Sequence, residues 1–123
     1  MAIIPTIRCR DIRASVRFYT QVLDFMRADG RDDADEFGFA VLSRAGDSIF
    51  LSTGTGDGEF GQALVVMDED VDALWQKFLS RGHVPPDSEG PVHRGPTDQT
   101  WGTREFYVDD PDGNTLRFTQ RRG

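Results

Sequence analysis

The order of the predicted secondary-structure elements repeats once along the chain, and this repeat constrains the fold more than any other feature. The first half predicts a strand, a helix and three strands, at residues 3–8, 11–23, 24–28, 37–42 and 48–52. The second half predicts the same series, at residues 62–67, 71–79, around Val92, 103–109 and 115–120. The strands are short, rich in β-branched and aromatic residues, and bounded by turn-forming residues. The chain therefore reads as β-α-β-β-β, twice.

Both predicted helices carry the usual boundary signals. Asp11 is the expected N-cap of the first helix, and acidic residues precede the second, at the positive end of its dipole. Gly82 and two prolines end the second helix. Its apolar residues recur with helical spacing and form one face that includes one of the two tryptophans: Val71, Leu74, Trp75, Phe78 and Leu79. We therefore expect Trp75 in the core.

The repeat predicts an α+β fold made of two βαβββ modules. Each module alone leaves one face of its sheet uncovered, so we expect two curved mixed sheets around a cleft, with the helices outside. At 123 residues the chain has the size of a single domain, 1–123, with halves at about 1–54 and 61–120 and a linker at 54–60. A groove lined by alternate strand residues is the expected place for a small-molecule site.

Composition excludes several classes of partner. The net charge of −7 and the pI near 4.7 argue against nucleic acid, whose phosphates require basic surfaces. The acidity favours a cationic ligand through long-range attraction, although solubility explains it equally well. No apolar run has the length of a membrane helix, and no signal peptide is evident at the start. With a single cysteine, these features predict a cytoplasmic protein that does not bind membranes.

Two stretches resemble a known superfamily. The first is IPTIRCRDIRASVRFY at residues 4–19, with its S-x-x-F-Y helix; the second is WGTREF at 101–106 followed by DPDGN at 110–114. Together with the repeat, they resemble the vicinal oxygen chelate superfamily, which includes glyoxalase I, extradiol dioxygenases, and fosfomycin and bleomycin resistance proteins. The ending is most similar to the bleomycin-resistance-like branch. The resemblance implies the glyoxalase/bleomycin resistance fold.

The resemblance also identifies the positions at which metal-dependent members carry ligands. Here they hold Pro5, Phe50, Gln62 and Arg117. Of the four, only Gln62 has a side-chain oxygen that can ligate, and a divalent ion needs several converging donors. We therefore expect no metal site and no cofactor.

With these replacements the expected cleft is aromatic and rich in hydrogen-bonding groups. The candidate ligand-binding residues are Phe37, Phe39, Phe50, Ser52, Gln62, Trp101, Glu105, Tyr107 and Arg117. Such a set suits a flat ligand, with stacking and cation–π contacts on the aromatic rings and a carboxylate to orient a cation. Two alternatives stay open: the phenylalanines can belong to the core, and Arg117 can simply pair with Glu105 across a hairpin.

These residues favour a binding protein over an enzyme. The leading hypothesis is a metal-independent protein that sequesters an aromatic or cationic compound, as bleomycin resistance proteins do, with no catalytic residue. The resemblance implies a homodimer with clefts between subunits. The first alternative is a glyoxalase-type lyase or isomerase of a small electrophile, with Glu105 as a general base. The second is a ligand-sensing module.

Overall fold

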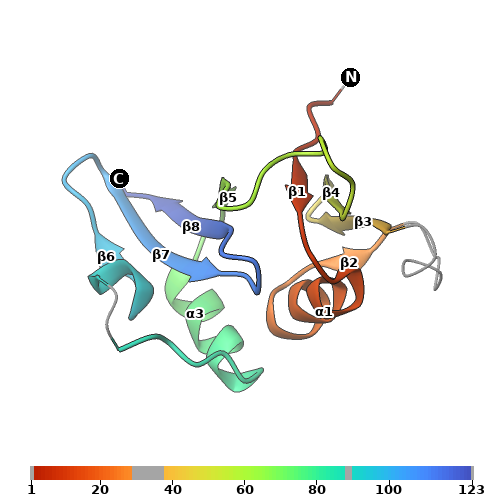
Figure 1. The fold of residues 1–123 in the computed structure, drawn as a ribbon. Helices are drawn as coiled ribbons and strands as arrows, with labels where there is room; N and C mark the ends of the chain where they lie inside the picture. Colours follow the sequence, from red (N-terminus) through yellow and green to blue (C-terminus); the bar gives the residue numbers. More distant parts are fainter. Residues whose placement is uncertain (1, 29–37, 88–89, 123) are drawn as a thin grey trace. The chain divides into compact units, whose positions relative to one another are not determined.

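The computed structural model describes residues 2–28, 38–87 and 90–122, which form two compact units. The first unit comprises Met1–Gln62 and Asp110–Asn114, and the second comprises Ala63–Asp109 and Thr115–Gly123. Figure 1 shows β1 to β4 with α1 in one unit, and β5 to β8 with α3 in the other. Within the described ranges, no helix is long and apolar enough to cross a membrane.

The first unit is a four-stranded mixed sheet with one helical segment. Its sheet order is β1-β4-β3-β2, in which β1 and β4 are parallel and the other pairs antiparallel. The elements are β1 (Thr6–Arg8), α1 (Ile12–Arg17), the π-helical turn η1 (Phe18–Val22), β2 (Met26–Arg27), β3 (Phe39–Arg44) and β4 (Asp47–Ser52). This is the predicted order of elements.

The first helix is not α-helical to its end. Asp11 caps it as predicted, because its carboxylate accepts a hydrogen bond from the backbone N–H of Ala14. After Arg17 the helix widens, and the N–H of Leu23 donates to the carbonyl of Phe18, five residues back. The sequence repeat predicts a helix here but does not predict the change from α-helix to π-helix after Arg17.

The second unit repeats the architecture. Its sheet order is β5-β8-β7-β6, again with one parallel pair, β5 and β8. The elements are β5 (Ala63–Met67), α3 (Val71–Ser80), the 3-10 turn η2 (Pro91–His93), β6 (Thr97–Asp98), β7 (Thr103–Asp109) and β8 (Thr115–Arg121). The α+β fold of two βαβββ modules is therefore confirmed.

The predicted strand around Val92 is wrong. Pro91, Val92 and His93 form the 3-10 turn η2, and the short strand of this module lies further on, at β6. Pro91 fixes its own φ and has no N–H for a strand ladder. The N–H of His93 instead donates to the carbonyl of Gly90, which closes a turn.

One face of each sheet packs against its own helix. In the second unit the core contains Phe78 of α3 together with Phe106 and Phe118, all fully buried, and the rings of Phe106 and Phe118 stack at 5.0 Å. Trp75 lies on the same helix face, is 6% exposed and contacts Phe106 edge to face, as expected for a core residue. The sequence identified this apolar layer correctly because its residues repeat at helical and strand periods.

Alternate strand residues point away from the helix, and we call the surface that they form the open face of each unit. In the first unit it includes Phe39 and Phe50, whose rings are 5.0 Å apart. In the second unit the strand register places on it, among others, Val65, Met67, Thr103, Glu105, Tyr107, Asp109, Arg117, Thr119 and Arg121. Val65 and Met67 are about half exposed, at 52% and 48%. Helix α3 therefore leaves this face uncovered.

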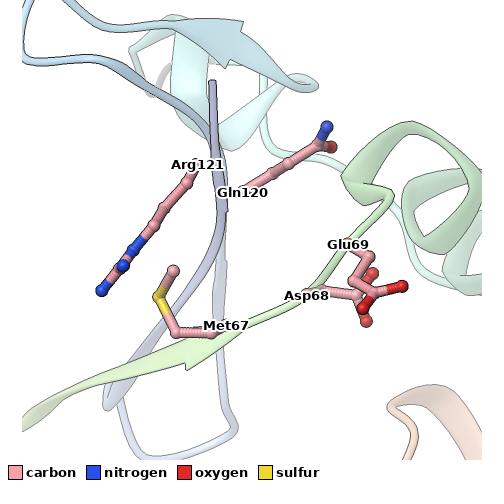
Figure 2. Close-up of a pocket in the computed structure, with 5 residues that line it drawn as sticks. All are labelled: Met67, Asp68, Glu69, Gln120 and Arg121. Atoms are coloured by element: carbon pink, nitrogen blue, oxygen red, sulfur yellow. The ribbon is translucent and has the colours of Figure 1, made fainter. Parts of the chain in front are cut away.

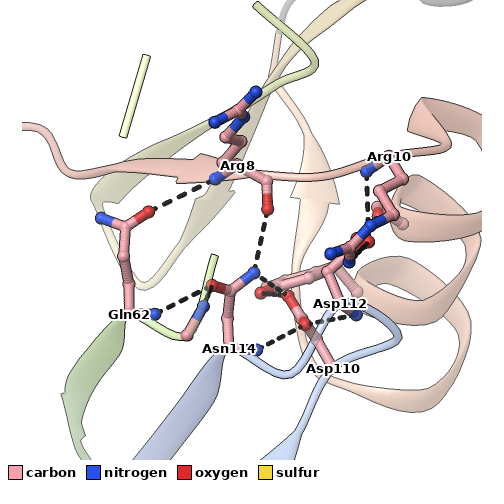
Figure 3. Close-up of polar contacts among 9 residues, drawn as sticks. Arg8, Arg10, Gln62, Asp110, Asp112 and Asn114 are labelled. Atoms are coloured by element: carbon pink, nitrogen blue, oxygen red, sulfur yellow. Dashed lines mark hydrogen bonds and ion pairs between the residues drawn. The ribbon is translucent and has the colours of Figure 1, made fainter. Parts of the chain in front are cut away.

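The turn after β7 belongs to the first unit, although both strands that it joins belong to the second. Asn114 is buried in it and uses both ends of its amide (Figure 3). Its oxygen accepts hydrogen bonds from the backbone N–H groups of Gly61 and Gln62, each at 3.0 Å. Its nitrogen donates to the carbonyl of Arg8 and to Asp110, each at 3.0 Å. One side chain thus joins the segment just before β5, the end of β1 and the turn.

Asp110 is the second polar centre of this turn. Its Oδ2 accepts a hydrogen bond of 2.7 Å from the hydroxyl of the fully buried Tyr19, and its Oδ1 accepts one from the backbone N–H of Asp112. Burial raises the pKa of Tyr19, and the adjacent Asp110 charge adds to this. The backbone N–H and the guanidinium of Arg10 both donate to Asp112, at 3.2 and 3.1 Å. The DPDGN turn is therefore fixed by side chains from the first module.

Candidate ligand-binding site

The structure divides the predicted site residues between the two units. Phe37 lies outside the described residues. Four candidates belong to the first unit: Phe39, Phe50, Ser52 and Gln62. The other four belong to the second unit: Trp101, Glu105, Tyr107 and Arg117. The second group forms a contiguous cluster through hydrogen bonds and ring contacts.

Glu105 is the centre of that cluster. It lies on β7, is 1% exposed, and faces away from α3. Its Oε2 accepts a hydrogen bond of 3.0 Å from the indole Nε1 of Trp101 and a short one from the hydroxyl of Thr103. Its Oε1 accepts one of 3.0 Å from Nη2 of Arg117 on β8. Three donors from three residues therefore hold one buried carboxylate.

These donors determine the charge state of Glu105. Burial alone would raise the pKa of this carboxyl, but the hydrogen bonds from Thr103, Arg117 and Trp101 outweigh burial and lower it. Glu105 is therefore ionised at neutral pH, and the Arg117 guanidinium neutralises its charge. A carboxylate held in this way is a poor general base, because three donors compete for its lone pairs.

The lowered pKa of Glu105 predicts how the stability of the fold depends on pH. Since Glu105 binds its proton less readily in the folded chain than in the unfolded one, its contribution to stability is complete above the unfolded pKa and falls as the pH drops through the folded pKa. We expect Glu105→Gln to cost stability near neutral pH, and the difference from wild type to shrink below about pH 4.5. Urea unfolding at a series of pH values measures this. A difference that grows on acidification would contradict it.

Trp101 is an exposed ring held by its polar edge. The side chain is 62% exposed, although its Nε1 is bonded to Glu105. An anchored indole loses little further freedom on binding, so its exposed face is suited to stacking. Next to Glu105, the Arg117 guanidinium lies 5.0 Å from the centre of the Tyr107 ring. Burial, with the Glu105 charge beside it, raises the pKa of Tyr107, so its phenol is neutral at pH 7.

The cluster includes residues that the sequence analysis missed. Thr103 precedes Glu105 by two positions, so strand alternation places both on one face. His93 has a side chain that is only 14% exposed; its ring meets Tyr107 edge to face at 5.6 Å, and its Nε2 lies 3.3 Å from Asp109. A long-range packing contact of this kind leaves no trace in the local sequence.

All four candidates in the first unit have partners within that unit. Phe39 and Phe50 contact each other on the open face, with Phe39 37% exposed, so this pair is a second aromatic surface. Ser52 is buried, and its hydroxyl donates to Asp57 at 2.8 Å, within the linker. The Oε1 of Gln62 lies 3.4 Å from the backbone nitrogen of Arg8 and accepts its hydrogen bond. Ser52 and Gln62 therefore already serve the first unit's own structure.

The positions that correspond, by the resemblance noted above, to metal-ligand positions do not form a donor set here. Phe50 packs on Phe39, Arg117 is paired with Glu105, and Pro5 offers no side-chain donor atom. Across residues 2–28, 38–87 and 90–122, no three His, Cys, Asp or Glu side chains come together as a group that could hold a metal ion. The residues at these four positions do not fit a divalent ion.

A shallow pocket of about 370 Å³ lies at the end of β5 and β8 in the second unit (Figure 2). Its lining residues are Met67, Asp68, Glu69, Gln120 and Arg121. Met67 and Arg121 leave their strands on the same side, which is the open face, and Arg121 pairs in register with Thr103. The pocket therefore extends the open face beyond the Glu105 cluster.

Comparison with known proteins identifies the family. The sequence profile of the Glyoxalase/Bleomycin resistance protein/Dioxygenase superfamily matches residues 4–118. Bleomycin resistance proteins of Geobacillus stearothermophilus and Staphylococcus aureus are each 30% identical over 137 aligned positions, which cover 96% of this chain and 95% of the relative.

Solved structures agree on the fold. A bleomycin-binding protein in complex with bleomycin superposes with a TM-score of 0.75 at 23% identity, covering 99% of both chains. The bleomycin resistance determinant encoded on transposon Tn5 gives a TM-score of 0.75 at 22% identity, covering 98% of both. The chain belongs to the Glyoxalase/Bleomycin resistance protein/Dioxygenase superfamily.

Proposed function

We propose that this protein binds a flat aromatic compound of the bleomycin type and sequesters it without altering it. The relatives that cover nearly the whole chain are bleomycin resistance proteins, and one structural neighbour is a bleomycin-binding protein complexed with bleomycin. The open face of the second unit offers a ligand surface without a set of reacting groups.

The observation that carries this proposal is the exposed Trp101 ring fixed through Nε1 to the buried Glu105. An aromatic side chain of this size is normally covered, and an exposed one that is also immobilised is typical of a recognition surface. Tyr107 and Arg117 lie beside Glu105 and supply a second ring and a cation. The Phe39–Phe50 pair of the first unit is a further candidate aromatic surface.

The glyoxalase-type alternative is weaker on physical grounds. Such an enzyme needs a group that takes up a proton near neutral pH. Glu105 was the candidate base, but its pKa is lowered and both of its oxygens accept hydrogen bonds. We therefore assign no catalytic residue.

Calorimetric titration of the purified protein with bleomycin tests the proposal. We expect saturable binding, with bleomycin recovered at unchanged mass after incubation. A protein that binds bleomycin no more tightly than about 1 mM, or that converts it to a new product, contradicts the proposal.

We also propose that the protein acts in the cytoplasm as a homodimer. The support for the dimer is the exposed apolar surface on both sheets, which includes Met26 at 71% exposure and Val65 at 52%. Light scattering after size exclusion is expected to give about twice the chain mass of 13.8 kDa. A mass of one chain at micromolar concentration would contradict the dimer.

A further inference from the structure

We propose that the aromatic ligand carries a hydrogen-bond acceptor, best a carboxylate, and that Arg117 binds this group beside Trp101. This inference rests on the proposed function and specifies the class of compound. It differs from the sequence expectation, in which a carboxylate of the protein orients a cationic ligand.

Glu105 cannot serve a cationic ligand well, because its oxygens are already engaged. Oε1 accepts from Arg117, and Oε2 accepts from Trp101 and Thr103. The carboxylate is 1% exposed, so a ligand cation could approach it only by displacing one of these donors. Displacement would break a hydrogen bond to a charged group, which is stronger than one between neutral groups.

Arg117, in contrast to Glu105, has more hydrogen-bond donors than acceptors around it. A guanidinium carries five N–H donors. Among the described residues, Nη2 donates to Glu105, Tyr107 is a further hydrogen-bonding neighbour of the guanidinium, and Nε is buried without a partner. The side chain is nevertheless 34% exposed, so part of the guanidinium is accessible. The five donors outnumber the acceptors in the cluster, and the exposed part of the guanidinium can donate to an acceptor on a ligand.

The surroundings of Arg117 suit a carboxylate attached to a ring. Val65 is its register partner on β5 and is half exposed, while Tyr107 is its partner on β7. An apolar side chain and an aromatic ring thus flank the cation, and a partly desolvated guanidinium binds carboxylates in a bidentate manner.

The other charged groups of the open face do not reverse the preference of this site for a carboxylate over a cation. Asp109 accepts a hydrogen bond from Thr115 at 2.7 Å and lies 3.3 Å from the imidazole of His93. Arg121 is exposed and is a second cation on the same strand face. Asp68 and Glu69 lie in the pocket beside Arg121 and not in the Glu105 cluster. The net charge of −7 acts over long range and is screened beyond about 8 Å at 0.15 M salt.

Three probes that share one ring test the inference: 2-naphthoate, 2-naphthamide and 2-naphthylmethylammonium. Calorimetric titration at about 0.15 M salt is expected to give the tightest binding for the carboxylate, intermediate binding for the amide and the weakest for the ammonium. We expect the carboxylate to bind at least about tenfold more tightly than the ammonium.

Three variants distinguish a direct contact of Arg117 with the ligand from a general loss of structure or of positive charge. Arg117→Gln should reduce the carboxylate preference to about twofold or less while the amide still binds. Arg121→Gln, which removes a cation from the same strand face, should leave most of the preference intact. Glu105→Gln keeps an acceptor but removes the negative charge that neutralises Arg117, so it should increase the preference for the carboxylate.

The outcomes also distinguish this inference from the proposed function. Equal binding of all three probes, or tightest binding of the ammonium, overturns the inference and leaves the proposed function standing. If none of the probes binds but bleomycin does, Arg117 does not bind an acceptor on a simple ring and the inference is wrong. If neither the probes nor bleomycin bind, both are wrong.

Discussion

Asn114→Asp is expected to lower the free energy of unfolding by about 3 kcal/mol. The substitution keeps the shape and the oxygen that accepts from Gly61 and Gln62, but it removes the two N–H donors to Arg8 and Asp110. It also places a second carboxylate against Asp110 at a site that is 1% exposed. Each buried group left without a partner costs about 1–3 kcal/mol, and the added charge is not compensated. Urea denaturation followed by circular dichroism measures the change.

Arg10→Ala is the matched control in the same network. It breaks an ion pair with Asp112 in which the arginine side chain is 64% exposed, so we expect a loss of about 1 kcal/mol or less. We also propose that both units unfold together as one domain, so that each variant gives a single transition. Equal effects of the two substitutions would show that burial of Asn114 does not matter, and would contradict the account of the turn.

Trp101→Ala is expected to weaken bleomycin binding at least tenfold, which corresponds to about 1.4 kcal/mol. The indole is 62% exposed and held by Glu105, so its removal takes away stacking area with little change in the core. Trp101→Phe keeps a ring but loses the bond to Glu105, and should bind with intermediate affinity. Calorimetry gives the affinities, and urea denaturation checks that both variants remain folded.

Two results would contradict this account of Trp101. One is unchanged affinity in Trp101→Ala, which would place the ligand elsewhere, for example at the Phe39–Phe50 pair. The other is a loss of affinity that accompanies a loss of folding comparable to that of Asn114→Asp. In that case the residue would be structural.

Local patterns predicted most of the fold, because they report periodicity and caps. The second helix was identified from its apolar stripe and from the acidic residues before it, of which Asp70 is the N-cap and accepts a hydrogen bond from the backbone N–H of Ala73. Where the pattern was weak, the prediction was wrong: Val92 lies in a 3-10 turn that begins at Pro91. The π-helical turn after Arg17 was not expected either, since it depends on backbone bonding and not on residue period.

The site was predictable as a set of residues but not as a network. Alternation placed Glu105 and Tyr107 on one strand face, and the hairpin register allowed Arg117 to reach Glu105, as the structure shows. The bond from Trp101 to Glu105 depends on a loop conformation that composition does not encode. His93 reaches Tyr107 through tertiary packing, so no local signal identified it.

Indole N–H resonances report whether a bound ligand lies on Trp101, because the chain contains only two tryptophans. Trp101 is exposed and bonded to Glu105, whereas Trp75 is buried against Phe106. In a titration of ¹⁵N-labelled protein with bleomycin, we expect the Trp101 signal to shift saturably and the Trp75 signal to stay in place. If binding by calorimetry is accompanied by no change at Trp101, the ligand does not occupy the open face of the second unit.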